Sequence, residues 1–320
     1  MKALITGANG FIGQVLLKKL INNGFKVRIL TRNLQKKKID NCEFFKVDLT
    51  SNTEDLSQVA VGCDFVFNCA GEVTDKKKMY DLHVIGTERL IKGVLESYRI
   101  DKKQKHWIQL SSIGVYGNSQ NHTKGVTINE DFKIKPVGEY EQTKAMSDAI
   151  IISYSKTNNL TYTILRPSTV VGTLMPNDSF KSLLNAIKNY QFFFIGSKNS
   201  ISTYIHVDDV VNALLVISKH QSAKNQTFNL SNDCYLVDIV NSISNTYGLK
   251  GNFICFPEKI VRVIAFIFSN FSRFPLTQSR IDSLISEVNY SSKKIKSMLD
   301  FKPSRSIPEF SSKYIRRTDV

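Results

Sequence analysis

Short apolar runs alternate with longer amphipathic stretches along the first half of the chain. The short runs, rich in β-branched and aromatic residues, predict strands at 3–6, 26–31, 43–47, 64–69, 106–111 and 161–165. Between them, apolar residues at helical spacing predict helices at 11–22, 82–99 and 141–156. Strands that alternate with helices of this length form parallel βαβ units, so we expect an α/β fold with a doubly wound parallel sheet.

The alternation weakens after Arg166, where Pro, Asn, Ser and aromatic residues become more frequent. Two later segments, 205–219 and 227–230, are expected to return to the sheet. The pattern therefore predicts a larger α/β domain made of residues 1–165 plus about 205–232. The remaining residues, 166–204 plus 233–320, are expected to form a smaller C-terminal α+β lobe.

Composition and charge remove several classes of protein. The 320 residues are 42% hydrophobic and 22% charged, which is ordinary for a globular chain and unlike a disordered one. Five scattered cysteines form no CxxC pair, and the five histidines do not cluster with them, so we expect reduced thiols, no metal site and a cytoplasmic protein. The opening MKALITG predicts a strand and a turn rather than a signal peptide.

An excess of 43 Lys+Arg over 28 Asp+Glu gives a net charge of +15, which could attract nucleic acid, acidic membranes or anionic small molecules. The lysines occur in short, separated runs without interleaved aromatic residues. We therefore predict a solvated basic surface and no nucleic-acid partner.

Three glycines punctuate the turn between the first predicted strand and the first helix. Gly7, Gly10 and Gly13 have the spacing GxxGxxG. A glycine at the strand end permits a tight turn, a second lets the backbone approach a pyrophosphate, and a third lets the helix pack closely. The helix N-terminus then faces the anion. The turn, with Asn9, Phe11 and Ile12, is predicted to bind a dinucleotide.

The residues after the second predicted strand bear on which dinucleotide binds. An acidic side chain there would accept hydrogen bonds from a ribose 2′-hydroxyl and repel a 2′-phosphate. The chain instead has Arg32, followed by lysines at 36–38. Because a guanidinium presents a planar fork suited to phosphate, we favour NADP(H), and NAD(H) remains the alternative.

Tyr140 and Lys144 are four residues apart, a spacing that places two residues on one helix face. A lysine ammonium near a phenol stabilises the phenolate and lowers its pKa, so the tyrosine can act as acid or base. The alternative is an exposed helix pair without chemistry. Ser112 follows the strand predicted at 106–111, at the sheet edge where doubly wound folds bind ligands.

Taken in order, these motifs resemble the extended short-chain dehydrogenase/reductase family of the NAD(P)-dependent epimerase/dehydratase type. The resemblance covers nearly the whole chain and implies a Rossmann domain with a substrate lobe. The matching motifs are TGANGFIG, Asp48-Leu49, Asn68-Cys69-Ala70-Gly71, LSSIGVYG, Tyr140 with Lys144, RPSTVVG from Arg166, YIHVDD from Tyr204 and SSKKIKSMLDFKP from Ser291.

The resemblance implies a role for individual residues. Tyr140 would be the catalytic acid/base, Lys144 would lower its pKa and hold the nicotinamide ribose, and Ser112 would orient the substrate oxygen. Further cofactor contacts implied by the family are Asp48 and Leu49 at the adenine, Cys69, Ala70 and Gly71 along the groove, and Pro167 and Val170 beside the nicotinamide. His83 stands where the family usually has Asn, and is expected to be a hydrogen-bonding substitute rather than a base, with a proton relay as the alternative.

Within this resemblance a dehydratase is disfavoured, and three functions remain open. A dehydratase needs an acidic pair directly after the catalytic hydroxyl, but Ile113 and Gly114 stand there and cannot exchange protons. Arg32 favours an enzyme that reduces a 4-keto sugar linked to a nucleotide, because the family's 4-epimerases usually hold NAD next to an acidic residue. A 4-epimerase of UDP-sugars remains an alternative, as does a non-catalytic NADP sensor.

The substrate lobe offers fewer motifs. The resemblance places a phosphate-binding arginine at Arg280, while the arginine that epimerases carry ahead of YIHV is replaced by Ser200 to Thr203. Enzymes of bacterial surface-polysaccharide sugar pathways have a similar tail, which suggests a UDP- or dTDP-linked sugar. Family members often dimerise through the helix that carries YxxxK, so a homodimer is expected.

The segment 259–271, KIVRVIAFIFSNF, is apolar on nearly every side and too short to span a bilayer. One interpretation is a buried or substrate-capping helix. The other is a peripheral contact with the inner face of the membrane, or with a partner, supported by the positive charge.

Overall fold

Seven parallel strands form one sheet in the order β12-β7-β5-β4-β1-β2-β3. The computed structural model describes residues 1–34, 39–117, 125–158, 160–176, 178–251, 253–268 and 276–318. The strands are β1 (Lys2–Thr6), β2 (Lys26–Thr31), β3 (Cys42–Lys46), β4 (Phe65–Asn68), β5 (His106–Leu110), β7 (Thr161–Pro167) and β12 (Gln226–Leu230). The strand order reverses direction at β1, as in doubly wound folds, so the predicted fold class is confirmed.

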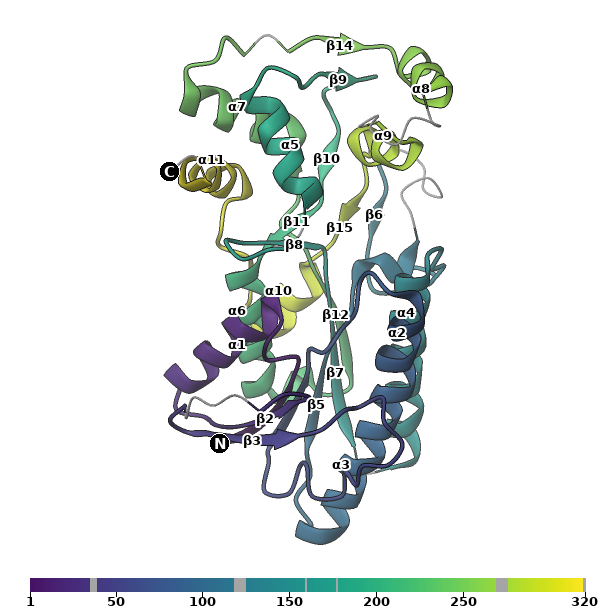
Figure 1. The fold of residues 1–320 in the computed structure, drawn as a ribbon, viewed down its shortest axis with the longest axis vertical. Coiled ribbons are helices and arrows are strands. Elements are labelled where there is room, and N and C mark those ends of the chain that lie inside the picture. Colours follow the sequence, from purple (N-terminus) through teal and green to yellow (C-terminus); the bar gives the residue numbers. More distant parts are fainter. Residues whose placement is uncertain are drawn as a thin grey trace.

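Helices cover both faces of this sheet (Figure 1). On one face, α1 (Phe11–Asn22) and α6 (Val207–Lys219) pack on Ala3 and Ile5. On the other, α3 (Thr87–Asp101) and α4 (Glu139–Thr157) belong to the core that contains Leu4. Successive residues of β1 thus enter opposite cores, as the period of a strand requires.

The helix predicted at 82–99 begins earlier and is irregular. It consists of α2 (Lys76–Tyr80), a π-helical turn η1 (Asp81–Gly86) and then α3. Apolar spacing does not reveal such a turn, because one extra residue per turn leaves the flanking helices amphipathic. π-Turns occur often at functional sites, and this one contains His83.

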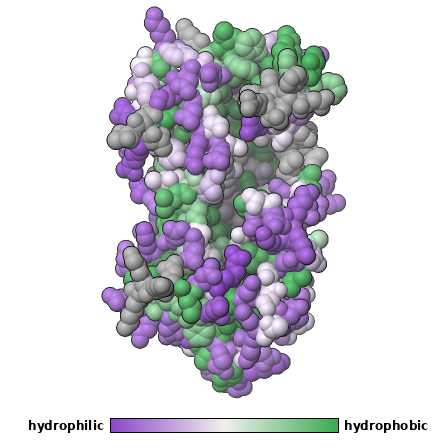
Figure 2. All heavy atoms as spheres, in the orientation of Figure 1, coloured by the Kyte–Doolittle hydropathy of each residue, from purple (hydrophilic) through white to green (hydrophobic). Residues whose placement is uncertain are grey.

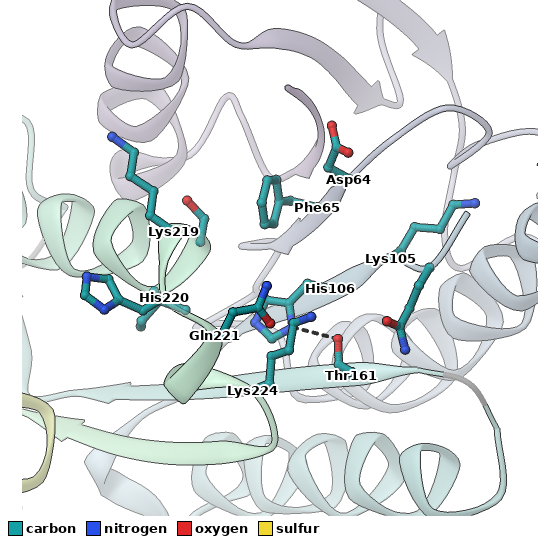
Figure 3. A pocket seen from close by; sticks show the side chains of 12 residues that line it. Asp64, Phe65, Lys105, His106, Thr161, Lys219, His220, Gln221 and Lys224 are labelled. Carbon is teal, nitrogen blue, oxygen red and sulfur yellow. Dashed lines mark hydrogen bonds between the residues drawn. The ribbon is translucent and has the colours of Figure 1, made fainter. Parts of the chain in front are cut away.

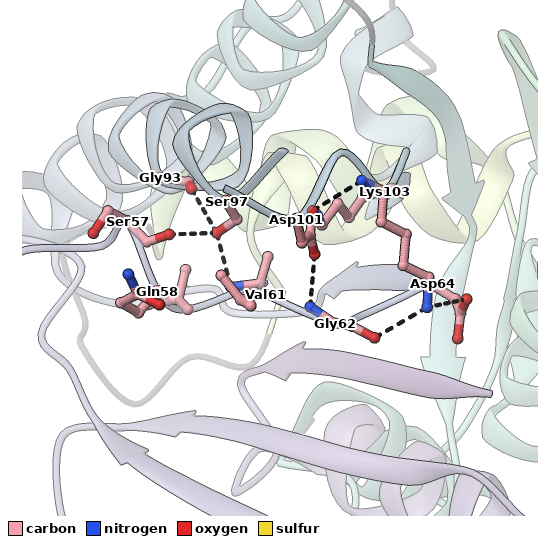
Figure 4. Close-up of polar contacts among 12 residues, drawn as sticks. Ser57, Gln58, Val61, Gly62, Asp64, Gly93, Ser97, Asp101 and Lys103 are labelled. Atoms are coloured by element: carbon pink, nitrogen blue, oxygen red, sulfur yellow. Dashed lines mark hydrogen bonds and ion pairs between the residues drawn. The ribbon is translucent and has the colours of Figure 1, made fainter. Parts of the chain in front are cut away.

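A polar clamp holds α3 against the loop between β3 and β4 (Figure 4). The fully buried Ser97 hydroxyl donates to the Ser57 carbonyl at 2.7 Å and accepts from the Ala60 N–H at 3.1 Å. One turn earlier, a Cβ on Gly93 would lie 2.5 Å from the Cβ of Leu56. The loop therefore approaches α3 as closely as a glycine allows.

The second part of the chain builds a layer above the carboxyl ends of the strands (Figure 1). Here α5 (Asp178–Lys188), α7 (Leu236–Tyr247) and α11 (Ile307–Thr318) surround a separate apolar core. The shorter elements are β6 (Thr127–Ile128), β8 (Thr169–Val171), β9 (Phe194–Ile195), β10 (Ile201–Ser202), β11 (Tyr204–His206), β13 (Cys234–Tyr235), β14 (Cys255–Phe256), α8 (Glu258–Ile267), α9 (Gln278–Ile285), β15 (Asn289–Tyr290) and α10 (Lys293–Leu299).

The two segments expected to return to the sheet do so differently. Residues 227–230 belong to β12, the sheet's edge strand. Ile205 instead lies in β11, which pairs with β8 outside the main sheet, and α6 then packs on the sheet face. Near the end of the chain, α10 joins the sheet's core through Ile295 and Leu299. The domain boundaries themselves stay a prediction. Among the described residues, no helix has the length and hydropathy of a membrane span.

Candidate active site

The glycine turn at the end of β1 is packed too tightly for any side chain. Gly7 has φ +69°, and a Cβ there would lie 2.7 Å from backbone atoms of Cys69 and Ala70. A Cβ on Gly13 would lie 2.0 Å from the Gly7 carbonyl oxygen. Helix α1 begins without a side-chain cap or an acidic residue in its first turn, so its N-terminal N–H groups suit an anion.

The turn after β3 is fixed by an arginine that the sequence did not single out. Arg89 on α3 donates to the carbonyl of Leu49 at 2.8 Å and to that of Glu54 at 3.2 Å. The Asp48 carboxylate accepts two hydrogen bonds from Thr50, and these, with a smaller contribution from Arg32, lower its pKa. Arg32 itself is exposed. Lysines 36–38, the other part of the cofactor prediction, lie outside the described residues.

A buried polar network supports the end of β4. Thr6 donates to Asn68 at 2.6 Å and accepts from the Ala70 N–H at 3.1 Å. The Asn68 amide then donates to Thr87 of α3 and to Gln109 of β5. The strand ends predicted to line the cofactor groove are therefore joined by hydrogen bonds.

Tyr140 and Lys144 lie in α4, with Lys144 almost completely buried. The Lys144 ammonium donates to the Leu110 carbonyl at 3.0 Å and lies 5.9 Å from the centre of the Tyr140 ring. Because the lysine is buried at the end of β5, the alternative of an exposed helix pair is wrong.

The electrostatics of this pair differ from the expectation. Burial raises the pKa of Tyr140 to about 12, and the nearby carboxylates of Glu141 and Asp148 raise it as well. Burial lowers the pKa of Lys144, while Asp148 opposes that shift. The expected lowering of the tyrosine pKa is not found in this structure, since burial outweighs the ammonium 5.9 Å from the ring.

Ser112 lies two residues after the end of β5 and caps the short helical turn η2 (Ile113–Tyr116). Its hydroxyl accepts from the Gly114 N–H at 3.1 Å. A Cβ on Gly114 would lie 2.8 Å from the Glu141 side chain, which brings this turn against the first turn of α4. Ser112 and Tyr140 therefore come from adjoining segments at the carboxyl edge of the sheet.

His83 links the loop after β4 to the catalytic helix. Its Nε2 accepts from the Glu72 N–H at 3.0 Å, which assigns the proton to Nδ1. Nδ1 then donates to the Thr143 hydroxyl at 2.9 Å, and that hydroxyl donates to the Tyr140 carbonyl at 3.0 Å. Burial, with Lys144 nearby, lowers the pKa of His83 to about 3. His83 is therefore a neutral histidine that forms hydrogen bonds through both ring nitrogens.

A buried ion pair lies behind the lysine, and the sequence did not single it out. Arg166 of β7 contacts the Asp148 carboxylate at 3.0 and 3.1 Å, and the Ser111 hydroxyl donates to the same oxygen. Arg166 also donates to the Tyr116 hydroxyl at 2.9 Å. Burial raises the pKa of Asp148, and Arg166 opposes that shift. Spacing alone places Asp148 one helical turn after Lys144, but it does not identify Arg166 of β7 as the partner.

The other predicted residues lie in β7, in β8 and in the layer above the sheet. Pro167 ends β7 and Val170 lies in β8. Arg280 is an exposed residue in the first turn of α9, where its N–H is capped by the Thr277 hydroxyl at 3.2 Å. The role of Arg280 in binding a phosphate stays a prediction.

A cavity of about 190 Å³ lies at the opposite edge of the sheet (Figure 3). Phe65, His106 and Thr161 line it at the starts of β4, β5 and β7. Both His106 ring nitrogens are hydrogen-bonded, to Thr161 and to Thr163, and burial lowers its pKa to about 4. The cavity is therefore remote from Tyr140, which lies beyond the carboxyl ends of these strands.

The residues at the carboxyl edge fit a dinucleotide. The glycine turn forms a cradle that a Cβ would fill, and the uncapped start of α1 supplies N–H donors for a pyrophosphate. Asp48 follows β3, Ala70 follows β4, and the Lys144 ammonium contacts the end of β5, along the edge that such a molecule would cross.

Comparison with known proteins supports this geometry. A family model, "NAD dependent epimerase/dehydratase family", matches residues 3–231. The chain is 27% identical over 288 residues to "Cinnamoyl-CoA reductase 2" of Medicago truncatula, covering 83% of each chain. A UDP-glucuronic acid 4-epimerase from Bacillus cereus, solved with NAD, is similar in structure with a TM-score of 0.73 at 19% identity, covering 99% of this chain and 97% of that one. RMD from Pseudomonas aeruginosa, solved with NADPH, has a TM-score of 0.69 at 16% identity, covering 98% of both chains.

Proposed function

Because this chain belongs to the NAD dependent epimerase/dehydratase family, we propose that it is an NADPH-dependent reductase of a keto sugar linked to a nucleotide. The observation that carries the proposal is the buried Lys144 beside Tyr140 at the carboxyl edge of the sheet. A non-catalytic sensor would not require a buried ammonium at that place. Burying a charge costs desolvation free energy, and a buried charge in a site therefore points to a functional role.

The cofactor is held by residues from several strand ends in this proposal. Gly7, Gly10 and Gly13 receive the pyrophosphate, with Asn9, Phe11 and Ile12 in the same turn, and Asp48 and Leu49 border the adenine. Cys69, Ala70 and Gly71 would line the groove for the cofactor, and Pro167 and Val170 would lie beside its nicotinamide. Arg32 takes the 2′-phosphate of NADPH, because the exposed guanidinium carries the positive charge that the phosphate needs.

The protein's own part in the reaction is to place and protonate the carbonyl oxygen. A bound reduced nicotinamide supplies the hydride that reaches the carbonyl carbon. Ser112 donates a hydrogen bond to the carbonyl oxygen, and the Tyr140 phenol gives that oxygen its proton as the C=O bond becomes C–OH. Lys144 stabilises the phenolate that remains on Tyr140 until solvent restores the proton.

The substrate class rests on the substrate lobe. Structurally similar proteins include a UDP-glucuronic acid 4-epimerase, and sequence relatives include a reductase. We therefore propose that the reaction is a reduction and that the substrate lobe binds the nucleoside diphosphate of the substrate. Arg280 is the candidate residue for binding this diphosphate. The chain is expected to act as a homodimer through α4, whose Met146 is exposed.

Separate incubations of the protein and NADPH with UDP-sugars and with their 4-keto forms test the reaction. Reductase activity consumes NADPH and increases the sugar's mass by two hydrogens. An inverted sugar of unchanged mass would indicate an epimerase, and saturable NADPH binding without turnover would indicate a sensor; either result refutes the proposal.

Two matched pairs of variants test the binding residues. Arg32→Ala should weaken NADPH binding about tenfold or more and leave NADH binding unchanged, whereas Lys26→Ala removes a charge at the other end of β2 and should change neither. Arg280→Ala should weaken UDP binding, and Ser283→Ala on the same helix should not. Equal effects within either pair would contradict the assignment.

A further inference from the structure

Helix α8 carries a continuous apolar surface that is exposed in the described part of the chain. Ile260, Val263, Ile264, Phe266 and Ile267 are between 42% and 74% exposed. At 3.6 residues per turn these positions fall on one side of the helix. We call them the apolar face of α8. Single exposed apolar residues are common, but a contiguous set of them marks an interaction site.

The opposite side of the helix is firmly attached to the protein. Val261 and Ala265 are buried in a cluster with Ile195 and Ile281. Arg262 donates to Glu258 at 2.8 Å and to the Asp282 carboxylate of α9 at 2.7 Å. The apolar face is therefore held outward by packing and ion pairs on the inner side. The interpretation of this segment as a buried helix is wrong for α8; residues 269–271 lie outside the described residues.

The surface continues into the strand before the helix and lies at one end of the molecule. Ile254 and Phe256, in and beside β14, are 65% and 40% exposed. Figure 2 shows hydrophobic residues gathered at the end of the molecule over α8. Figure 1 places α8 at one end of the long axis, away from the main sheet. A flat surface can therefore reach the apolar face without meeting the sheet.

Charge and side-chain chemistry select the occupant. The chain has a net charge of +15, which attracts it to an anionic surface. The face consists of Ile, Val and Phe and holds no outward Tyr, Trp, Met or Arg, the residues enriched at protein interfaces. Lys259, exposed at the start of α8, can keep its ammonium among headgroups while its stem lies on apolar surface.

We propose that the apolar face of α8 docks this protein on an anionic lipid membrane. At 10 residues α8 is too short to cross a bilayer, so it lies in the plane of the interface with its apolar face among the acyl chains. Basic residues elsewhere on the chain add attraction to acidic headgroups. Together these two sources make a reversible peripheral contact rather than an anchor.

Vesicle binding can be measured through a single introduced tryptophan. The chain's one tryptophan, Trp107, is fully buried, so Phe266→Trp gives a reporter on the apolar face. With vesicles of phosphatidylcholine containing phosphatidylglycerol, its emission should shift to the blue and be quenched by brominated acyl chains. Phosphatidylcholine vesicles alone should bind more weakly, and added salt should reduce binding to the anionic vesicles.

Serine substitutions then identify the surface responsible. Vesicle cosedimentation of the triple variant Val263→Ser, Phe266→Ser and Ile267→Ser should fall about tenfold or more relative to the wild type. Ile100→Ser, which removes an exposed apolar residue of α3, should bind as the wild type does. Absence of wild-type binding, or equal binding by the triple variant, would overturn the proposal. So would a smaller oligomer of the triple variant in lipid-free light scattering, since this would assign the face to self-association.

Discussion

His83 should make the stability of this protein depend on pH in a way that a single substitution removes. Its pKa lies at about 3 instead of the usual 6.5. The unfolded chain therefore takes up a proton as the pH falls through 6.5, while the folded chain does not. The stability is fully present above this value and is lost progressively below it, down to about pH 3.

The size of the effect follows from the two pKa values. A pH of about 5 lies 1.5 units below the pKa of the histidine in the unfolded chain, and each unit changes the free energy of unfolding by about 1.4 kcal/mol. Wild-type protein should therefore lose about 2 kcal/mol between pH 7.5 and 5 through His83. His83→Asn, which has no titrating group, should lose about 2 kcal/mol less over the same range. Urea unfolding at both pH values measures the difference.

His106 provides the matched control. Its pKa is lowered to about 4 by burial, so His106→Gln should remove a pH-dependent loss of similar size, about 2 kcal/mol at pH 5. It lies at the opposite edge of the sheet, and turnover should be unchanged. His83→Asn should lower turnover, because the link through Thr143 to the Tyr140 turn is altered. If His83→Asn unfolds with the wild-type pH dependence, the assignment of a neutral buried histidine is refuted.

Three further substitutions test the packing of the site. Gly13→Ala should abolish the thermal stabilisation by NADPH, because its Cβ would lie 2.0 Å from a loop carbonyl, whereas Gly251→Ala, with open space around it, should retain it. Asp148→Asn should cost about 3 kcal/mol or more in urea unfolding by leaving Arg166 buried without its counter-charge, and adding Arg166→Met should recover part of that loss. A loss under 1 kcal/mol would contradict the buried ion pair. Ser97→Ala should cost about 1–3 kcal/mol, since a buried backbone N–H loses its acceptor; unchanged stability would show that water replaces the hydroxyl.

Local sequence was sufficient for much of the fold. The strand of residues 26–31 and the helix of residues 11–22 form with the predicted bounds. They could be predicted because apolar residues are spaced differently along a strand and along a helix. The glycine turn could also be predicted from the sequence, because three glycines between a strand and a helix are typical of a dinucleotide-binding turn. The π-turn around His83 could not be predicted, because its extra residue does not change the apolar spacing of the flanking helices.

The candidate site divides in the same way. The YxxxK spacing placed Tyr140 and Lys144 on one face, and that prediction needed only the helical repeat. The sign of the tyrosine's pKa shift needed the structure, because burial is set by segments far away in the chain. Asp148 meets Arg166 only because α4 packs against β7. Spacing cannot reveal a pair made across two elements.

The sequence by itself determined which elements form and which chemical groups stand at the strand ends, because both follow from spacing along the chain. Only the tertiary structure decided the surroundings of those groups, since burial, partners and exposure depend on segments brought together by folding. Helix α8 shows the difference most clearly: seven of its ten residues are apolar in the sequence. Whether they are covered was decided by α9, which packs on one side of α8 and leaves the other exposed.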